Sequence, residues 1–271
     1  MLPEINYHPI QGNVLQDQGY YTFAPSAPLS RWVQHYWQLN VPLGRYCYRS
    51  MPDNCVDVII NLRNADDIFI VTPYSSAVVF ELTGPEAYFC IRFRLLGHKA
   101  IVSTPLEEWD LLSNDTRNAD VIPTRVIDAL QDLTRLNLPF EQRCQHISTA
   151  LLNASRQPNV DRRLMRFVRY SHQHVSSNID LSEKTCSEFG LSARQLRRLT
   201  QLHFGLSPRD FTRVMRFQHA LDRLKTQPRK AFWTDNYYDQ SHFIREFKRM
   251  SGAKPNALFG LSVLYNNDKP F

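Results

Sequence analysis

The chain has 271 residues, of which 43% are hydrophobic and 12% aromatic, and it carries a formal net charge of +6. This composition suits one large or two ordinary folded domains and excludes wholesale disorder or a collagen-like repeat. The longest apolar runs, such as 77–80, are far shorter than the roughly 20 residues that cross a bilayer, so we expect no membrane span. The N-terminus lacks the basic start and apolar stretch of a signal peptide, which predicts a cytoplasmic location.

The five cysteines are widely spread and form no CxxC pair. An odd number without paired spacing is untypical of a secreted disulfide framework, so we expect reduced thiols. None of the nine histidines makes a zinc-like pair with a cysteine, and no phosphate loop or nucleophile elbow occurs. We therefore expect no metal, no cofactor, no catalytic residue and no enzymatic activity.

The charge is unevenly distributed along the chain. Residues 1–155 contain 11 Lys+Arg and 16 Asp+Glu, which gives −5, whereas residues 156–271 contain 21 and 10, which gives +11. This division predicts two domains with different partners, the second of which faces a polyanion. Arginine dominates the basic half and its apolar positions belong to a core, which favours nucleic acid over a membrane surface. A merely solvated basic surface is the alternative.

The acidic half begins with β-type signals. Aromatic and β-branched residues fill 29–39, and Val41–Gly44 is expected to break the chain. The triplet 52–54 is turn-forming, which predicts a hairpin between 45–51 and 55–62. Further extended segments are expected at 68–72, 77–83 and 87–94, with breaks at Thr72-Pro73 and Gly84-Pro85. Several short strands of this kind predict a β-barrel or sandwich.

An aromatic cluster in this half has two interpretations. Its rings line an effector pocket, or they form part of the barrel core, as aromatic side chains in small barrels more often do. The residues concerned are Trp32, Tyr36, Trp37, Tyr46 and Tyr48.

Two amphipathic helices are predicted after the strands, over 125–137 and 140–154, because apolar residues recur at helical spacing. The second has the apolar positions Phe140, Cys144, Ile147 and Leu151. This face either packs on the barrel or forms a dimerisation seam with a second subunit. We place the end of the N-terminal domain, residues 1–155, at the linker 155–159.

The basic half has the pattern of a helix-turn-helix. An amphipathic helix starting near 160 and a short helix at about 181–189 precede Gly190, and Ser192 is expected to cap a helix that ends near Phe204. On this helix Leu196, Leu199 and His203 share one face. The opposite face carries Arg194, Arg197, Arg198 and Gln201. Arginine forks suit guanine edges and phosphates, so this face is typical of a major-groove recognition helix.

A long helix and a second candidate recognition helix follow. The Ser207-Pro208 cap predicts a helix over 208–226, about 28 Å long, which is similar to the spacing of successive major-groove faces. In 240–250, Phe243, Phe247 and Met250 form an apolar face. The opposite side and flank carry Gln240, Ser241, His242, Arg245 and Lys248.

Three motifs carry a family resemblance: GLSARQLRR at 190–198, FGLSP at 204–208 and YDQSHFIREFKRMSGAKP at 238–255. Together they resemble the double helix-turn-helix of AraC/XylS-family transcription regulators over about residues 160–260. The acidic half is more weakly similar to the variable N-terminal β-domains of that family, through 53–57 and 91–94. Such domains commonly sense a ligand or dimerise.

The resemblance implies that Arg194, Arg197 and Arg198 contact base edges or phosphates, and that Gln240, Ser241, His242 and Arg245 do so in the second motif. The chain departs from the family pattern at Phe232 and Asn236, where the family has a small residue and a glycine, and 225–234 is short for the usual scaffold helix.

We therefore expect an α+β protein: a β-rich N-terminal domain (1–155) that ends in two helices, an all-α double helix-turn-helix domain (160–260) and a tail (261–271). The resemblance implies a double-stranded DNA-binding regulator, an activator that contacts RNA polymerase, with a small-molecule effector or a homodimer interface in its N-terminal domain. Two alternatives are a DNA-binding adaptor with a purely protein-interacting N-terminal domain and a cupin-like metal enzyme.

Overall fold

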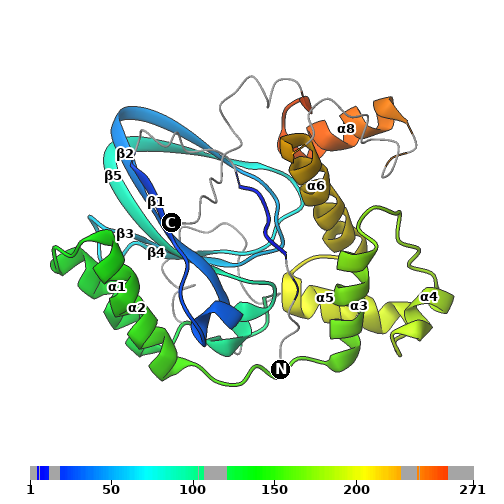
Figure 1. The fold of residues 1–271 in the computed structure, drawn as a ribbon, viewed down its shortest axis with the longest axis horizontal. Coiled ribbons are helices and arrows are strands. Elements are labelled where there is room, and N and C mark those ends of the chain that lie inside the picture. Colours follow the sequence, from blue (N-terminus) through cyan, green and yellow to red (C-terminus); the bar gives the residue numbers. More distant parts are fainter. Residues whose placement is uncertain are drawn as a thin grey trace.

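The computed structural model describes residues 5, 7–11, 19–102, 104–106, 121–226, 237 and 239–255. Figure 1 shows a curved sheet with two helices against it on one side of the molecule and a group of helices on the other. No helix among these residues is long and apolar enough to cross a membrane.

The strands form one antiparallel sheet of order β1-β2-β5-β3-β4 (Figure 1). Its members are β1 (Tyr20–Phe23), β2 (Val33–Ser50), β3 (Asp57–Asn61), β4 (Ile68–Val71) and β5 (Val78–Phe93), and short 3₁₀ turns occur at η2 (Leu29–Arg31) and η3 (Gly97–Ala100). The predicted β-rich N-terminal domain followed by helices is confirmed.

The two longest strands bend where the sequence predicts breaks. Leu43 and Gly44 both lie opposite Gly84, so β2 carries a bulge there, and Gly44 has a φ of 102°. A Cβ on Gly84 would collide with the Pro42 carbonyl oxygen, so only glycine fits this approach. The expected breaks at 41–44 and 84–85 are therefore wrong as strand ends. They mark the bend at which the paired strands curve over their own inner face.

The predicted hairpin between 45–51 and 55–62 is also wrong. The end of β2 pairs with the start of β5, whereas β3 pairs with β4 and β5. The connecting residues 51–56 are buried, and the Asn54 side-chain amide donates to the Phe211 carbonyl at 3.0 Å. Contacts with the distant helices, rather than a local turn, set the path of this segment.

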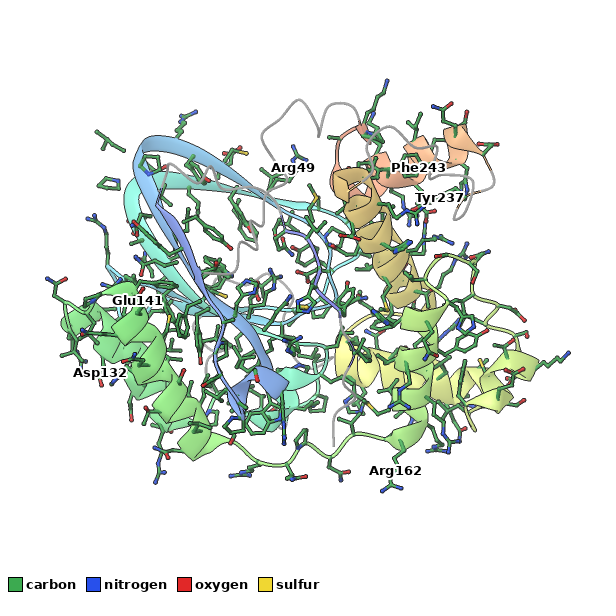
Figure 2. The ribbon with its side chains drawn as sticks, viewed as in Figure 1. Arg49, Asp132, Glu141, Arg162, Tyr237 and Phe243 are labelled. Carbon is green, nitrogen blue, oxygen red and sulfur yellow. The ribbon has the colours of Figure 1, made fainter. Side chains whose placement is uncertain are left out.

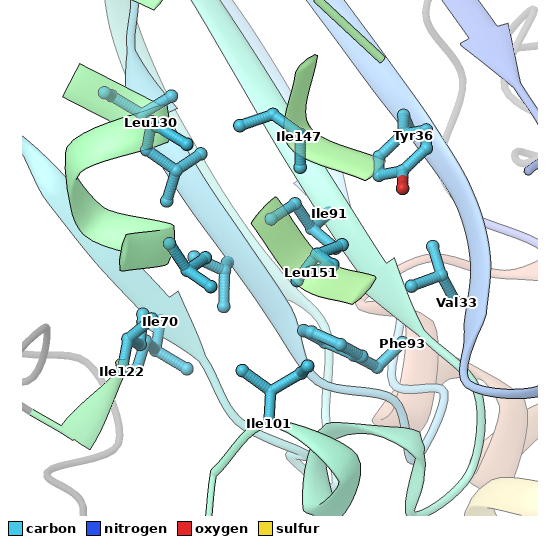
Figure 3. Close-up of a cluster of buried hydrophobic side chains, with 14 of the residues drawn as sticks. Val33, Tyr36, Ile70, Ile91, Phe93, Ile101, Ile122, Leu130, Ile147 and Leu151 are labelled. Carbon is cyan, nitrogen blue, oxygen red and sulfur yellow. The ribbon is translucent and has the colours of Figure 1, made fainter. Parts of the chain in front are cut away.

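The outer face of the sheet is covered by α1 (Thr124–Arg135) and α2 (Phe140–Ala154), close to the predicted bounds. Figure 3 shows Leu130, Ile147 and Leu151 of these helices beside sheet residues of the same core. Fully burying an aliphatic side chain of this size contributes about 1.5–3 kcal/mol, so the packing fixes both helices on the sheet.

This packing decides between the two interpretations of the α2 apolar face. Cys144, Ile147 and Leu151 are fully buried in the core, and Phe140 packs partly buried at its edge. Cys144, Ile147 and Leu151 are therefore not available for the alternative dimerisation seam, because the protein's own sheet covers these three side chains.

The second half consists of α3 (Arg162–Gln173), α4 (Glu183–Glu188), α5 (Ala193–Phe204), α6 (Pro208–Thr226) and α8 (Gln240–Ser251). The predicted linker lies in the irregular stretch between α2 and α3. The expected short scaffold helix at 225–234, with Phe232, lies outside the described residues except for the last turn of α6, as does Asn236.

The two halves share buried contacts. Met51 and Ile10 pack in one cluster with residues of α6 and α8, and Tyr7 packs with residues of α3 to α6 in another. Gln218 of α6 is buried and bonds to both N-terminal segments that make this contact. Its side-chain amide donates to the Pro52 carbonyl at 2.7 Å, and its side-chain carbonyl accepts from the Ile10 amide at 2.7 Å. The sheet domain is thus attached directly to the long helix.

Candidate nucleic-acid interface and effector cavity

The sequence fixes the start and end of α5 through local contacts. Ser192 Oγ accepts from the Gln195 backbone amide at 3.2 Å, and Gln195 Oε1 accepts from the Ser192 amide at 3.0 Å, which completes a capping box. Gly190 before the helix and Gly205 after it have φ values of 79° and 67°, which other residues adopt only at a cost. The predicted cap and helix end are confirmed.

The packing of α5 leaves the predicted basic stripe exposed. Leu196, Leu199 and His203 are buried on the inner face. Arg194, Arg197, Arg198 and Gln201 are all exposed on the other face. Within the described part of the chain, no carboxylate lies within ion-pair distance of the three arginines, whereas the Gln201 side-chain amide donates to the Gly205 carbonyl at 3.1 Å. Three guanidiniums are thus presented together to solvent.

The long helix α6 connects the two candidate recognition helices. Ser207 caps it by accepting from the Asp210 amide at 3.1 Å. It has 19 residues, which at 1.5 Å per residue gives about 28 Å. Buried Phe211, Phe217 and Leu221 hold it against the other helices. A rigid spacer of this length suits two contacts with successive major-groove faces.

The second candidate recognition helix, α8, resembles α5 in its caps and in having one buried and one exposed face. Asp239 caps it by accepting from the His242 amide at 2.7 Å, and Gly252 ends it with a φ of 74°. Its buried face is the predicted one, formed by Phe243, Phe247 and Met250. The predicted contact residues Gln240, Ser241, Arg245 and Lys248 are exposed, and His242 is partly buried.

A buried ion-pair network joins α8 to α6, and the sequence analysis missed it. Glu246 accepts from Arg213 Nε at 2.9 Å and from Arg216 Nη2 at 3.1 and 3.2 Å. Arg216 also donates to Asn178 Oδ1 and lies 5.3 Å from the centre of the Tyr237 ring. Figure 2 shows Tyr237 and Phe243 together at this end of the molecule.

The network lowers the pKa of Glu246 and also includes His242. Burial raises the pKa of Glu246, but the charge of Arg216 and the hydrogen bond from Arg213 outweigh it and hold the pKa below 4.5. The His242 ring lies 3.7 Å from Glu246, so this predicted DNA-facing residue also faces the network. The only sequence signal was an acidic residue between the two apolar positions 243 and 247.

The inner face of the bent sheet lines a cavity of about 50 Å³ that is partly open to solvent. Its wall contains Trp37 and Tyr48 of β2, which lie on the same strand on either side of the bend. Of the other predicted effector residues, Tyr46 packs at the edge of the apolar cluster on this inner face, which contains Trp37. Tyr36 and Trp32 pack instead in the core under α1 and α2. The structure thus brings Trp37, Tyr46 and Tyr48 together and separates Trp32 and Tyr36 from them.

The cavity wall also contains residues that the aromatic pattern did not identify. These are Leu39, Ser50, Asp57, Ile59, Phe69, Val71, Phe80, Leu82 and Tyr88. Among the wall residues that the structure describes, Asp57 is the one that is charged. The sequence contains one signal for Asp57. It lies two residues before Ile59 in a strand, so the two side chains face the same side of β3.

Two family models match separate parts of the chain. Residues 185–260 match a helix-turn-helix domain family, and residues 21–111 match a domain of unknown function, DUF6597. No curated protein matches the chain.

Three solved structures of ToxT from Vibrio cholerae are similar to this chain. One, at 1.65 Å resolution, has 15% identity and a TM-score of 0.43 over 94% of this chain and all of that chain. Apo ToxT K231A has 12% identity and a TM-score of 0.42 over 94% and 96% of the two chains. The form bound to an unsaturated fatty acid has 13% identity and a TM-score of 0.40 over 94% and 95%.

The capped helix α5 with its exposed basic stripe, the spacer α6 and the family match over 185–260 define a helix-turn-helix DNA-binding domain. This domain is of the AraC type, as the three sequence motifs implied.

Proposed function

We propose that the protein is a sequence-specific regulator of transcription that binds double-stranded DNA and whose sheet domain binds a small effector. The observation that carries the DNA-binding part is the stripe of three exposed arginines on the capped helix α5, none of which pairs with a described carboxylate. Arginine binds guanine O6 and N7 with two hydrogen bonds, and each such pair contributes about 1–3 kcal/mol of discrimination. The proposed site of action is the cytoplasm, and the protein is proposed to be no enzyme.

The effector part of the proposal is supported by the position of the cavity. Ser50 belongs to its wall, and Pro52, two residues further on, accepts a hydrogen bond from Gln218 of α6. This hydrogen bond gives a change in the cavity wall a direct path to the helix that spaces α5 and α8. Activation through contact with RNA polymerase is proposed on the family resemblance, and transcription in vitro with purified polymerase tests it.

The DNA-binding proposal is tested by selecting bound sequences from random duplex DNA with the full-length protein at fixed salt, because the affinity depends strongly on salt. We expect two conserved blocks about 10 base pairs apart, one for each recognition helix. A single block would limit base reading to one helix. Enrichment that persists when Arg194, Arg197 and Arg198 are all replaced by alanine would refute the assignment of α5.

The adaptor hypothesis, in which the sheet domain only dimerises or binds another protein, makes a different prediction. Under that hypothesis no small molecule changes the affinity for the selected DNA, and the oligomeric state alone controls binding. A screen of small molecules by thermal shift, followed by DNA titration with each hit, separates the two. A homodimer is compatible with both, and sedimentation with and without DNA measures it.

A further inference from the structure

The wall of the cavity has a composition that selects for one class of ligand. Five aromatic rings belong to it: Trp37, Tyr48, Phe69, Phe80 and Tyr88. Since a water-sized occupant needs about 10–15 Å³ by the same measure, the volume of about 50 Å³ corresponds to about three to five small groups. The faces of aromatic rings carry partial negative charge and attract cations.

Asp57 supplies the one carboxylate among the described residues of this largely apolar wall. The residue is only 9% exposed, and its Oδ1 accepts no hydrogen bond from any described residue. The nearest cationic atom, Arg92 Nε, lies 3.4 Å from this oxygen. Burial raises the pKa of Asp57 to about 7, and Asp53 adds to the rise, whereas Arg92 and a hydrogen bond with Cys90 oppose it. Asp57 Oδ1 is thus ion-paired with Arg92, but it still accepts no hydrogen bond from a described residue.

The charges behind the wall support this conclusion. Asp53 and Asp57 share one cation, Arg92, and Asp53 has the closer contact with it. Asp53 also accepts from the Gln11 side chain and from the Cys55 amide. Burial, Arg92 and other nearby cationic groups lower the pKa of His35 to about 3, so this imidazole is neutral. With both carboxyls ionised, the cluster has one negative charge in excess.

We propose that the cavity binds a small primary alkylamine as its ammonium ion, with Asp57 as counter-ion and hydrogen-bond acceptor and the aromatic rings around the alkyl chain. The proposal rests on the effector-binding function above and names the class of effector. An N–H donor supplies the hydrogen bond that Asp57 Oδ1 lacks, and the ammonium charge balances the second carboxylate, which shares Arg92 with Asp53. The rings stabilise both the charge and the apolar chain.

The test compares n-butylamine with n-butanol, which has a similar shape and no charge, by calorimetric titration of the full-length protein at pH 8. At this pH butylamine is protonated and Asp57 is mostly ionised. A charge-assisted hydrogen bond predicts that the amine binds about tenfold to hundredfold more tightly than the alcohol. Equal affinities, or binding of neither compound, would overturn the proposal.

Two variants locate the binding. Asp57→Asn should remove the preference for the amine and leave the affinity for the alcohol unchanged, and Asp66→Asn, an exposed carboxylate in the turn after β3, is the matched control. Phe80→Leu, at a partly exposed part of the wall, should weaken the amine about threefold to tenfold through loss of the cation–π contact. Amine binding that survives both substitutions would contradict the proposal.

Titration of the selected DNA with the same preparations distinguishes the two proposals. DNA binding without amine binding overturns the ligand class and leaves the regulator function standing. Amine binding that depends on Asp57, in a protein that selects no DNA sequence, supports the ligand class and refutes the regulator.

Discussion

The two candidate recognition helices have similar lengths and similar caps but are held in place by different interactions. The orientation of α5 depends on contacts close in sequence, such as the Ser192–Gln195 capping box, and on apolar packing. The orientation of α8 depends in addition on a buried carboxylate, Glu246, that bonds to Arg213 and Arg216, 33 and 30 residues away. We therefore expect that a substitution in one set of contacts disturbs one helix and leaves the other in place.

The largest effect is expected at the ion-pair network. Glu246→Ala removes the carboxylate that Arg213 and Arg216 share. Arg213 keeps its ion pair with Asp210, whereas the buried Arg216 keeps no carboxylate among the described residues, and removing one partner of a buried pair costs about 3 kcal/mol or more. We expect this loss in the free energy of unfolding measured by urea denaturation. We also expect the variant's affinity for the selected DNA to become independent of the base sequence in the block that α8 reads.

Two control variants make this test specific. Glu188→Ala removes an exposed carboxylate from α4 and should leave the stability within about 0.5 kcal/mol of the wild type. Glu246→Gln keeps the acceptor oxygen but removes the charge, so its stability should lie between those of the wild type and Glu246→Ala. A Glu246→Ala protein as stable as Glu188→Ala would mean that apolar packing alone holds α8.

The next effect concerns base reading by α5. Arg198→Ala should lower the affinity for the best selected DNA by about 1–3 kcal/mol and relax the preference at one base pair, with little change in stability. The control is Arg162→Ala, an exposed arginine at the start of α3 that Figure 2 shows at the opposite end of the helical half from α8. If both variants lose the same affinity on every sequence, Arg198 contributes charge and does not read a base.

A smaller effect concerns the pH dependence of stability, which differs between His203 on α5 and Glu246 on α8. Burial, aided by Lys99 and opposed by Asp161, lowers the pKa of His203 on the inner face of α5 to about 4. The unfolded chain therefore takes up this proton near pH 6.5 and the folded chain only near pH 4, so stability is lost as the pH falls between these values. The pKa of Glu246 lies below its ordinary 4.5, so its contribution is lost only at lower pH.

The measurement is the free energy of unfolding from pH 7 to pH 4.5 for the wild type and His203→Gln. The variant should lose less stability over this interval, because the neutral amide takes up no proton. Parallel curves for the two proteins would show that His203 has the same proton affinity in the folded and unfolded chains.

The same contrast explains what could be predicted from the sequence. The Ser192 cap, the turn at Gly190 and the buried faces of α5 and α8 depend on residues a few positions apart, and these were predicted. The Asp239 cap of α8 was not. The Glu246 network, the Asp57 cavity and the docking of 51–54 on α6 join residues far apart in the chain, and no local pattern encodes them. The strand ends expected at 41–44 and 84–85 were wrong for a related reason. The two segments lie opposite each other across β2 and β5, where Gly44 pairs with Gly84 at the bend.

The smallest effect tests whether α8 contacts the DNA backbone. Lys248 is exposed on the outer side of α8, and a lysine that neutralises one phosphate releases about one counterion. Lys248→Ala should therefore weaken binding to all sequences similarly and by less than about tenfold, and it should reduce the slope of log affinity against log salt by about 1. Titrations of the best and a scrambled sequence at four salt concentrations measure both quantities. An unchanged slope would place Lys248 away from the phosphates, and a loss confined to the best sequence would make it a base contact like Arg198.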